Sequence, residues 1–244
     1  MTFASHVNHF LENNNWQTFY RQFKNNYFKA ITTAGTDYWN VHTQGLELAD
    51  IDNRDKENTE ILDLGTWFGL LPYMLKQYGF AKVDASECLA HSQGLRDLFE
   101  NILWPAFNLD PYELHVLPLQ EFTLPKQYDI ITCFQSNLFW KTKEVIHFTH
   151  KSPISNDMWE VIDKTGTAHT FFTVYKKHEW NFFINNLRKF LKPGGKAIIQ
   201  PSPFVYDVID GYAAEYEYLK PFIVEGPKDN KINGSKAFYV VIEK

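Results

Sequence analysis

Two acidic residues and a glycine-containing turn are the features of this sequence most able to do chemistry. A short apolar run delivers Asp63 and ends at Gly65, and a helical pattern opens near Gly69. Glycines let a ligand approach the backbone closely, and a helix start offers unpaired N–H groups to a negative group. The second acid, Asp84, is expected to end the next strand, 19 positions after Gly65. In nucleotide-binding α/β folds an acid at about this interval hydrogen-bonds ribose hydroxyls. The glycine turn and Asp84 together therefore favour a nucleotide-type binding site over an ordinary strand-to-helix turn.

Apolar runs alternate with helix-like segments from residue 60 onward. Strands are expected at residues 60–65, 82–86, 114–119, 128–134, 196–200, 221–225 and 237–243. Helices are expected at residues 70–78, 87–103 and 181–191, with a turn at 192–195. Strands that alternate with helices predict an α/β fold with a doubly wound, mostly parallel sheet. The last two strands would pair antiparallel, which gives a seven-stranded sheet with a terminal antiparallel strand.

Residues 1–57 are expected to form an N-terminal helical segment and an acidic linker. Aromatic residues recur there at spacings of three and four, which indicates one or two amphipathic helices. Residues 47–60 carry six acidic and two basic side chains, as a solvated connection would. The remaining unit, residues 58–244, would be the main domain, with a lid-like insertion at about 135–180.

The composition restricts the compartment and the partners that are expected. The net charge is −5, from 24 basic and 29 acidic residues, which argues against a nucleic-acid partner. Two cysteines without zinc-type spacing imply neither a disulfide framework nor a metal site. The chain has neither a run of 18 apolar residues nor a leader-like start, so a cytoplasmic protein without membrane attachment is expected.

Four stretches, in this order, resemble the class I S-adenosylmethionine-dependent methyltransferases. They are ILDLGTWFG at 61–69, VDAS at 83–86, YDIITC at 128–133 and LRKFLKPGG at 187–195. The resemblance covers roughly residues 58–244. It implies S-adenosylmethionine as cofactor, S-adenosylhomocysteine as its product, and transfer of the methyl group to an acceptor.

The resemblance also implies a set of cofactor-binding residues. They are Asp63, Gly65, Trp67, Gly69, Asp84, Ser86, Gln120, Glu121, Phe134 and Gln135. Asp63, Gly65 and Gly69 would lie around the amino-acid part of the cofactor. Asp84 would hold both ribose hydroxyls through charge-assisted hydrogen bonds.

The remaining implied contacts concern the two ends of the cofactor. Gln120 or Glu121 falls where the family often places a polar residue against the adenine amine. Phe134 and Gln135 would border the methyl-donor end. Trp67 stands where the family usually has glycine, so it would either cover the cofactor or indicate an altered or lost site.

A long interval follows the strand expected at 128–134 and holds four of the nine histidines. Either it forms a lid with the N-terminal helices, or it is a packed structural insertion or dimer contact. His147 and His150 are the candidates for a general base, because they follow most closely on the strand end that would face the methyl group. Many members of the family rely on positioning alone.

Three functions are compatible with these residues. The first is methyl transfer to an oxygen or nitrogen of a small-molecule acceptor by a monomer or homodimer. The second is methylation of a protein or RNA, and the third is a catalytically inactive binding protein with the same fold, which Trp67 would favour.

Aromatic residues gather in two segments, 10 within residues 1–40 and 11 within 134–183. That distribution favours an aromatic-lined, fairly apolar acceptor pocket and does not name the acceptor.

Overall fold

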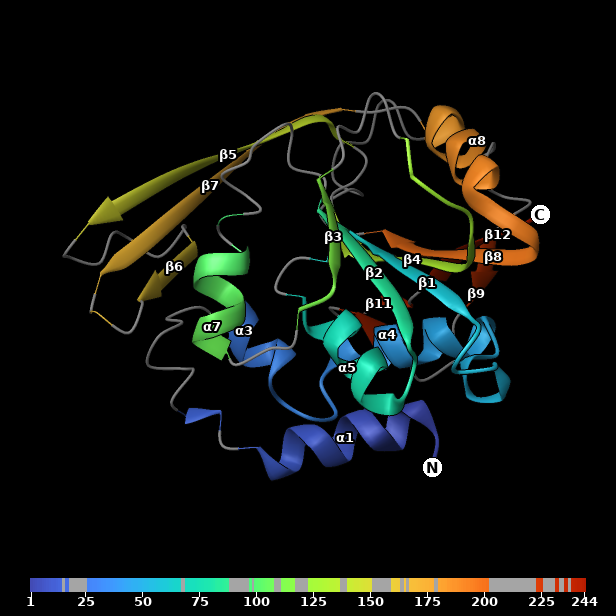
Figure 1. The fold of residues 1–244 in the computed structure, drawn as a ribbon, viewed down its shortest axis with the longest axis horizontal. Helices are drawn as coiled ribbons and strands as arrows, with labels where there is room; N and C mark the ends of the chain where they lie inside the picture. The colour runs from blue at the N-terminus through green and yellow to red at the C-terminus, as the bar shows by residue number, and fades with distance from the viewer. Residues whose placement is uncertain are drawn as a thin grey trace.

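Buried apolar strands form one seven-stranded sheet at the centre of the molecule (Figure 1). In spatial order the strands are β3 (Glu113–Val116), β2 (Lys82–Glu87), β1 (Glu60–Leu64), β4 (Tyr128–Ser136), β8 (Leu191–Pro201), β12 (Phe238–Glu243) and β9 (Ile223–Glu225). The first five run parallel, and β12 is antiparallel to both β8 and β9. This order confirms the predicted doubly wound, mostly parallel sheet. The antiparallel strand that ends the chain lies between β8 and β9 rather than at the edge.

The computed structural model describes the sheet, most of the helices that cover it and a second sheet. The described residues are 1–14, 16–17, 26–66, 69–87, 97, 99–107, 111–116, 123–136, 140–150, 159–162, 165, 167–177, 180–201, 223–225, 231–232, 235–236 and 238–244.

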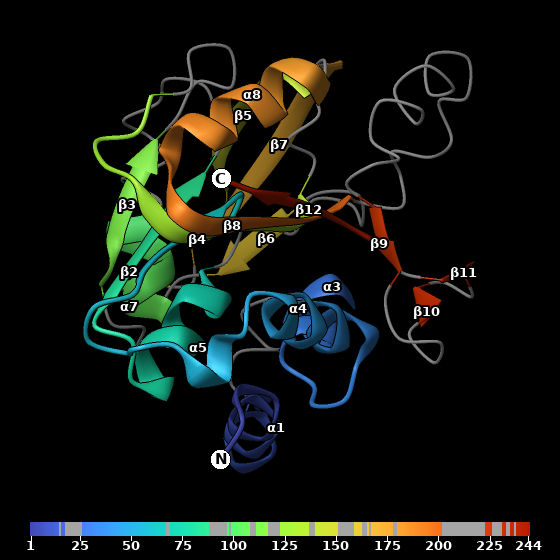
Figure 2. The same cartoon turned by 90° about the vertical axis from the view of Figure 1, so that its right-hand side faces the viewer.

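Helices cover the two faces of the sheet because residues on each strand alternate between two cores (Figure 2). One face carries α1 (Phe3–Asn13), α4 (Asp37–Leu48) and α5 (Leu70–Tyr78). The other face carries α8 (Trp180–Phe190), whose Phe183, Ile184 and Leu187 pack on the sheet. The shorter segments are α3 (Asn26–Ile31), a 3₁₀ turn (Ile51–Asn53), a π-helical turn (Phe99–Leu103) and α7 (Trp104–Phe107).

The N-terminal helices share a core with the sheet. Phe3 and Val7 of α1 and Trp39 and Leu46 of α4 are buried in the same cluster as Ile61 of β1. Helices α1 and α4 therefore belong to the layer that covers this face of the sheet.

Residues 192–195, expected as a turn, lie within strand β8. Tyr128 of β4 pairs with Leu191 and Ile130 with Lys196, so four residues of β8 stand opposite Asp129 alone. Gly194 adopts a left-handed φ of +74° in this bulge. The Pro-Gly-Gly sequence thus forms a bulge within the strand and does not end it.

A second, three-stranded antiparallel sheet follows β4, in the order β5 (Trp140–His150), β7 (Ala168–Lys177) and β6 (Trp159–Ile162). Strand β5 begins four residues after β4 ends, and it extends away from the carboxyl end of β4 (Figure 1). The sequence was expected to form an insertion here, and these three strands were not predicted. A further pair, β10 (Lys231–Ile232) and β11 (Ser235–Lys236), is antiparallel.

Helix α4 lies unusually close to the sheet because it carries Gly45. A Cβ atom at Gly45 would overlap Cε1 of Phe134, lie 2.5 Å from Cζ of the same ring and 3.1 Å from Cε1 of Tyr239. Two side-chain hydrogen bonds fix the helix: Tyr239 Oη donates to the Val41 carbonyl (2.9 Å), and Trp39 Nε1 donates to the Ile31 carbonyl (2.6 Å). The absence of a side chain at Gly45 therefore places α4 against the carboxyl-terminal half of β4.

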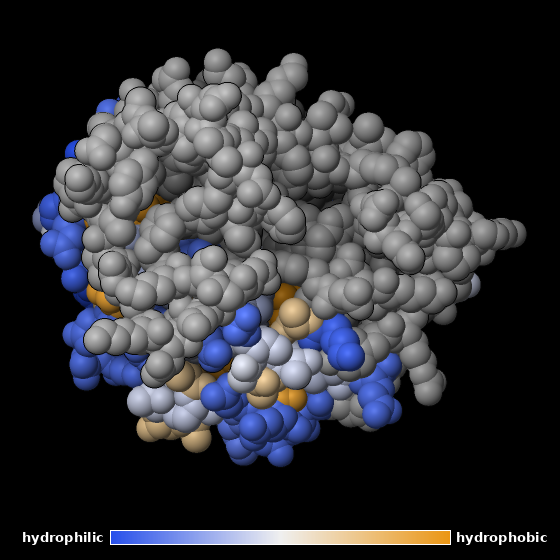
Figure 3. All heavy atoms as spheres, turned by 180° about the vertical axis from the view of Figure 1, so that it is seen from behind, coloured by the Kyte–Doolittle hydropathy of each residue, from blue (hydrophilic) through white to orange (hydrophobic). Residues whose placement is uncertain are grey.

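Hydrophilic residues predominate on the described part of the face seen in Figure 3. Among the described residues, Met1 is the one large hydrophobic side chain that is exposed. None of the helices described is long and apolar enough to cross a membrane.

Candidate active site

The turn after β1 is hydrogen-bonded to the carboxyl end of β2. Gly65 has a left-handed φ of +67°, and the N–H groups of Gly65 and Thr66 both donate to the Ser86 carbonyl, at 2.7 and 3.0 Å. These two N–H groups are therefore already engaged and do not face a ligand. Among the described residues of the turn, Thr66 is the one whose side chain could contact a ligand.

Helix α5 begins at this turn, with Gly69 as its N-cap at a φ of +70°. A Cβ atom at Gly69 would overlap the hydroxyl of Tyr112 and lie 2.7 Å from Cζ of that ring. Tyr112, which is buried, thus packs directly on the start of the helix. Glycine is required at this position both by the backbone conformation and by the close approach of Tyr112.

Three buried polar side chains lie near the carboxyl ends of strands in the parallel part of the sheet. They are Thr66 after β1, Ser86 near the end of β2 and Gln200 near the end of β8, with exposed fractions of 5%, 0% and 3%. Within the part of the chain that the structure describes, Thr66 Oγ1, Ser86 Oγ and Gln200 Oε1 have no hydrogen-bond partner. Buried polar atoms are normally satisfied, so these three retain the capacity to form hydrogen bonds with another molecule. In open α/β sheets this edge is where ligands bind.

Asp63 is buried on the α4 and α5 face of the sheet. Its Oδ1 accepts a hydrogen bond from Thr132 Oγ1 of the neighbouring strand β4, at 2.7 Å. The side chain is 4% exposed. This hydrogen bond therefore joins β1 to β4 one residue before β1 ends.

Asp84 lies elsewhere than the sequence indicated. It is the third of six residues in β2, which continues to Glu87, so the prediction that Asp84 ends its strand is wrong. Its Oδ2 accepts from Tyr128 Oη at 2.9 Å and pairs with Lys126 Nζ at 2.9 Å, and His115 Nε2 lies 3.6 Å away. Burial raises the pKa of the Asp84 carboxyl, but hydrogen bonds from His115, Lys126 and Tyr128 outweigh burial and leave this pKa below its usual value.

Phe134 lies within β4, which runs to Ser136, rather than just beyond the strand. Its ring is buried and packs edge-on against His42 of α4, with ring centroids 4.9 Å apart. Gln135 follows it in the same strand. Trp67, Gln120 and Glu121 lie outside the described residues.

His147 and His150 both belong to β5, where they pair with Phe171 and Ala168 of β7. In the sequence they follow the end of β4 closely. An extended strand rises about 3.3 Å per residue, so β5 carries the backbone of His147 about 23 Å and that of His150 about 33 Å from Trp140. Proximity in sequence to the end of β4 is therefore not proximity in space.

His42 is a candidate that the sequence did not single out. It is 3% exposed, its Nδ1 is 2.6 Å from the Tyr38 carbonyl, and its ring stacks on Tyr38 with centroids 4.1 Å apart. Because a carbonyl can only accept, Nδ1 carries the proton of this hydrogen bond. Burial lowers the pKa of His42 to about 4, so the ring is neutral at pH 7 and Nε2 is a proton acceptor.

The depressed pKa of His42 predicts a pH-dependent stability. A buried neutral histidine stabilises the fold fully above its unfolded pKa, 6.5, and this contribution is lost as the pH falls toward about 4. Relative to His42→Asn, which does not titrate, the native chain should lose about 3 kcal/mol of unfolding free energy between pH 7 and pH 4. Urea unfolding at several pH values measures the difference, with His9→Asn on the exposed side of α1 as the control for replacing a histidine. A constant difference between the native chain and His42→Asn over this range would contradict the assignment.

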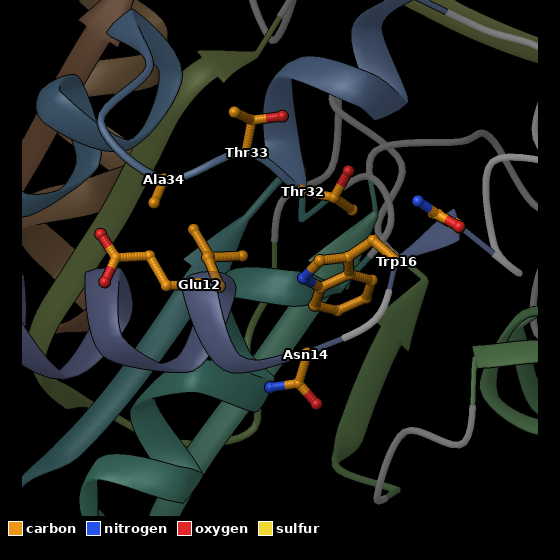
Figure 4. A pocket seen from close by; sticks show the side chains of 8 residues that line it. Glu12, Asn14, Trp16, Thr32, Thr33 and Ala34 are labelled. Atoms are coloured by element: carbon orange, nitrogen blue, oxygen red, sulfur yellow. The ribbon is translucent and has the colours of Figure 1, made fainter.

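A separate cavity of about 480 Å³ lies between the end of α1 and the loop after α3 (Figure 4). It is lined by Leu11, Glu12, Asn14, Trp16, Gln17, Thr32, Thr33 and Ala34. None of the residues discussed above lines it.

Comparison with known proteins gives structural likeness only. No protein-family model matches the chain, and no curated protein matches it. Among solved structures, the N-methyltransferase NodS from Bradyrhizobium japonicum WM9, in complex with S-adenosyl-L-homocysteine, has a TM-score of 0.46 at 12% identity, covering 82% of this chain and 83% of that one. The ribosomal protein L11 methylase from Lactobacillus delbrueckii subsp. bulgaricus has a TM-score of 0.44 at 12% identity, covering 84% of this chain and 78% of that one. A putative class I S-adenosylmethionine-dependent methyltransferase from Listeria monocytogenes has a TM-score of 0.42 at 15% identity, covering 85% of this chain and 61% of that one.

Proposed function

We propose that this protein is an S-adenosylmethionine-dependent methyltransferase that binds its cofactor at the carboxyl ends of β1 and β2. The observation that carries the proposal is the pair of buried, unpartnered hydroxyls of Thr66 and Ser86 beside the left-handed turn at Gly65. They lie next to the point where the strand order reverses, between β1 and β4, which is the ligand-binding crevice of open α/β sheets. The four stretches of sequence that resemble the family fall on β1, β2, β4 and the junction of α8 with β8.

The residues at this edge suit the polar parts of the cofactor. Hydroxyls of Thr66 and Ser86 can each donate and accept a hydrogen bond, as ribose hydroxyls and an amino-acid group require. Helix α5 is nine residues long, and its first turn offers the positive end of the helix dipole to a carboxylate. When bound, S-adenosylmethionine supplies an electrophilic methyl group.

The acceptor is proposed to be a small molecule that is methylated on oxygen or nitrogen. The α4 side of the edge brings together the ring of Phe134, the neutral imidazole of His42 and the amide of Gln200, whose Cα pairs with that of Phe134. Nε2 of His42 lies across the ring from the bond to Tyr38, so it is able to accept a hydrogen bond from a hydroxyl or amine. An aromatic wall with one hydrogen-bond acceptor suits a fairly apolar methyl acceptor.

A second candidate function is methylation of a protein or RNA, and a third is cofactor binding without transfer. The second candidate gains no support from the charge, which is −5 overall. The third is favoured by Trp67, which replaces the usual glycine of the family.

One labelling experiment separates these three functions. The purified chain is incubated with methyl-labelled S-adenosylmethionine and a cell extract split at about 3 kDa, each fraction with a control lacking the protein. We expect label in products of the small-molecule fraction. Label in protein or RNA of the large fraction would contradict a small acceptor, and binding of the cofactor without any transfer would identify an inactive binding protein.

A further inference from the structure

We propose that the cavity between the end of α1 and the loop after α3 binds a small organic ammonium ion with an apolar body (Figure 4). No residue assigned above to the cofactor or to the methyl acceptor lines this cavity. The ammonium ion would therefore be a ligand additional to both, and its binding does not rest on the proposed function.

The cavity has two walls, each formed where a helix ends. After α1, the N–H of Trp16 donates to the Asn14 carbonyl at 3.1 Å, and the indole packs against Phe10 with ring centroids 6.0 Å apart. On the opposite wall, the hydroxyl of Thr33 donates to the Lys29 carbonyl of α3 at 2.7 Å. Contacts within each wall therefore shape the cavity without a ligand.

The size and the lining of the cavity suit a small molecule with an apolar body. Its volume of about 480 Å³ lies within the range of about 300–1,000 Å³ that is usual for small-molecule sites. Two of the lining side chains, Leu11 and Trp16, are apolar and buried. Three polar ones are exposed, namely Glu12, Asn14 and Thr33. An occupant with an apolar body and one polar end matches this division.

The charge around the cavity is negative. Glu12 is the one charged side chain among the eight that line it, and within the described part of the chain its carboxylate forms no hydrogen bond or ion pair. This carboxylate lies on the Ala34 side of the cavity, whereas the Trp16 ring lies on the Thr32 side (Figure 4). Helix α1, eleven residues long, ends here without a basic residue in its last turn, so its own side chains do not neutralise the negative end of its dipole. Lys29, exposed in the last turn of α3, does not line the cavity.

The exposed polar side chains of the lining offer hydrogen-bond acceptors. Nδ2 of Asn14 donates to the Phe10 carbonyl at 2.6 Å, which leaves Oδ1 as the acceptor of this side chain. The hydroxyl proton of Thr33 is directed at the Lys29 carbonyl, so its oxygen can only accept from a ligand. An ammonium group has three donors and no acceptor, and it complements these oxygens and the Glu12 carboxylate. A carboxylate ligand would bring further acceptors to the same groups.

The test is calorimetric titration of the full chain at pH 7 with 2-phenylethylammonium, 2-phenylethanol and 3-phenylpropanoate. The three compounds share a phenyl group and differ in the charge of the polar end. We expect 2-phenylethylammonium to bind about tenfold more tightly than the neutral alcohol, because hydrogen bonds between charged groups are the stronger kind. The anion 3-phenylpropanoate should bind more weakly than the alcohol.

Two variants locate the binding within this cavity. Glu12→Gln should bind 2-phenylethylammonium about fivefold more weakly and 2-phenylethanol as the unsubstituted chain does, because it removes the charge alone. Glu57→Gln removes an exposed carboxylate from the turn before β1 and is the matched control, with both affinities unchanged. Ala34→Leu enlarges a side chain of the lining and should weaken binding of both compounds about tenfold. Thermal unfolding checks each variant, and if Ala34→Leu does not fold, the comparison of the two exposed glutamates decides.

Three results would overturn the assignment. Equal affinities for 2-phenylethylammonium and 2-phenylethanol would show that the site does not select a cation. Equal affinities of Glu12→Gln and Glu57→Gln for 2-phenylethylammonium, or undiminished binding by a folded Ala34→Leu, would show that binding occurs elsewhere. Absence of heat with 2-phenylethylammonium at millimolar concentration would show that the cavity takes no such ligand.

Discussion

Gly69→Ala is expected to lower the free energy of unfolding by about 3 kcal/mol, combining left-handed strain of about 1–2 kcal/mol with overpacking of about 1–3 kcal/mol. The new methyl group would overlap the hydroxyl of the buried Tyr112, and the residue would keep a φ of +70°. Since Gly69 begins α5 beside the proposed cofactor, binding of S-adenosylhomocysteine should weaken as well. Urea unfolding measures the stability.

Gly35→Ala is a matched control for this prediction. Gly35 has the same φ of +70°, but nothing lies within 4 Å of a Cβ atom built there. Its alanine variant should therefore show the backbone strain alone, about 1–2 kcal/mol. The difference between the two variants isolates the clash with Tyr112. Equal losses of unfolding free energy for Gly69→Ala and Gly35→Ala would show that Tyr112 does not contact the start of α5.

Gly45→Ala is expected to destabilise the protein by about 2–3 kcal/mol through overpacking. Helix propensity alone predicts the opposite sign, a gain of about 1 kcal/mol for alanine over glycine inside a helix. The two predictions differ because the methyl group would overlap the ring of Phe134 and approach Tyr239. Chemical denaturation therefore tests the packing of α4 on β4 by the sign of the effect.

The substitution Phe134→Leu supplies the control for Gly45→Ala. In a chain that already carries Phe134→Leu, Gly45→Ala should cost much less, because the overlapping ring atoms are gone. A stabilised Gly45→Ala single variant would mean that α4 does not lie this close to the sheet. In that case His42 would not be held against Phe134 either.

The parallel core of the fold could be predicted because several of its strands, such as β1 and β4, are short runs rich in apolar residues. The expected strand at 128–134 and helix at 70–78 correspond to β4 and α5, with identical bounds for the helix. The expected pairing of 221–225 with 237–243 is confirmed by the antiparallel contact of β9 with β12. These segments are recognisable locally because burial on both faces demands unbroken apolar sequence.

The second sheet was missed because its strands mix polar, charged and aromatic residues. Trp140–His150 has no unbroken apolar run, and its order comes from pairing with Ala168–Lys177, some 20 residues further on. Such pairing depends on contacts that no local pattern shows. The same limit explains why His147 and His150 looked close to the end of β4 in the sequence.

The sequence pointed to the turn after β1 and to β2 as the candidate site, but the contacts of these residues could not be predicted from it. The sequence could not show that Tyr128 and Lys126, more than 40 positions away, occupy the carboxylate of Asp84. Nor could it show that Gly45 brings His42 to Phe134, since an isolated histidine on a helix is most often a core or surface residue.

Calorimetric titration of the unsubstituted chain with S-adenosylhomocysteine tests the central claim most directly. ATP and NAD, titrated in the same way, are the controls for a general nucleotide site. The account predicts one-site binding of S-adenosylhomocysteine with a raised melting temperature, and no comparable heat with either control. Absence of both heat and thermal stabilisation with S-adenosylhomocysteine would contradict it.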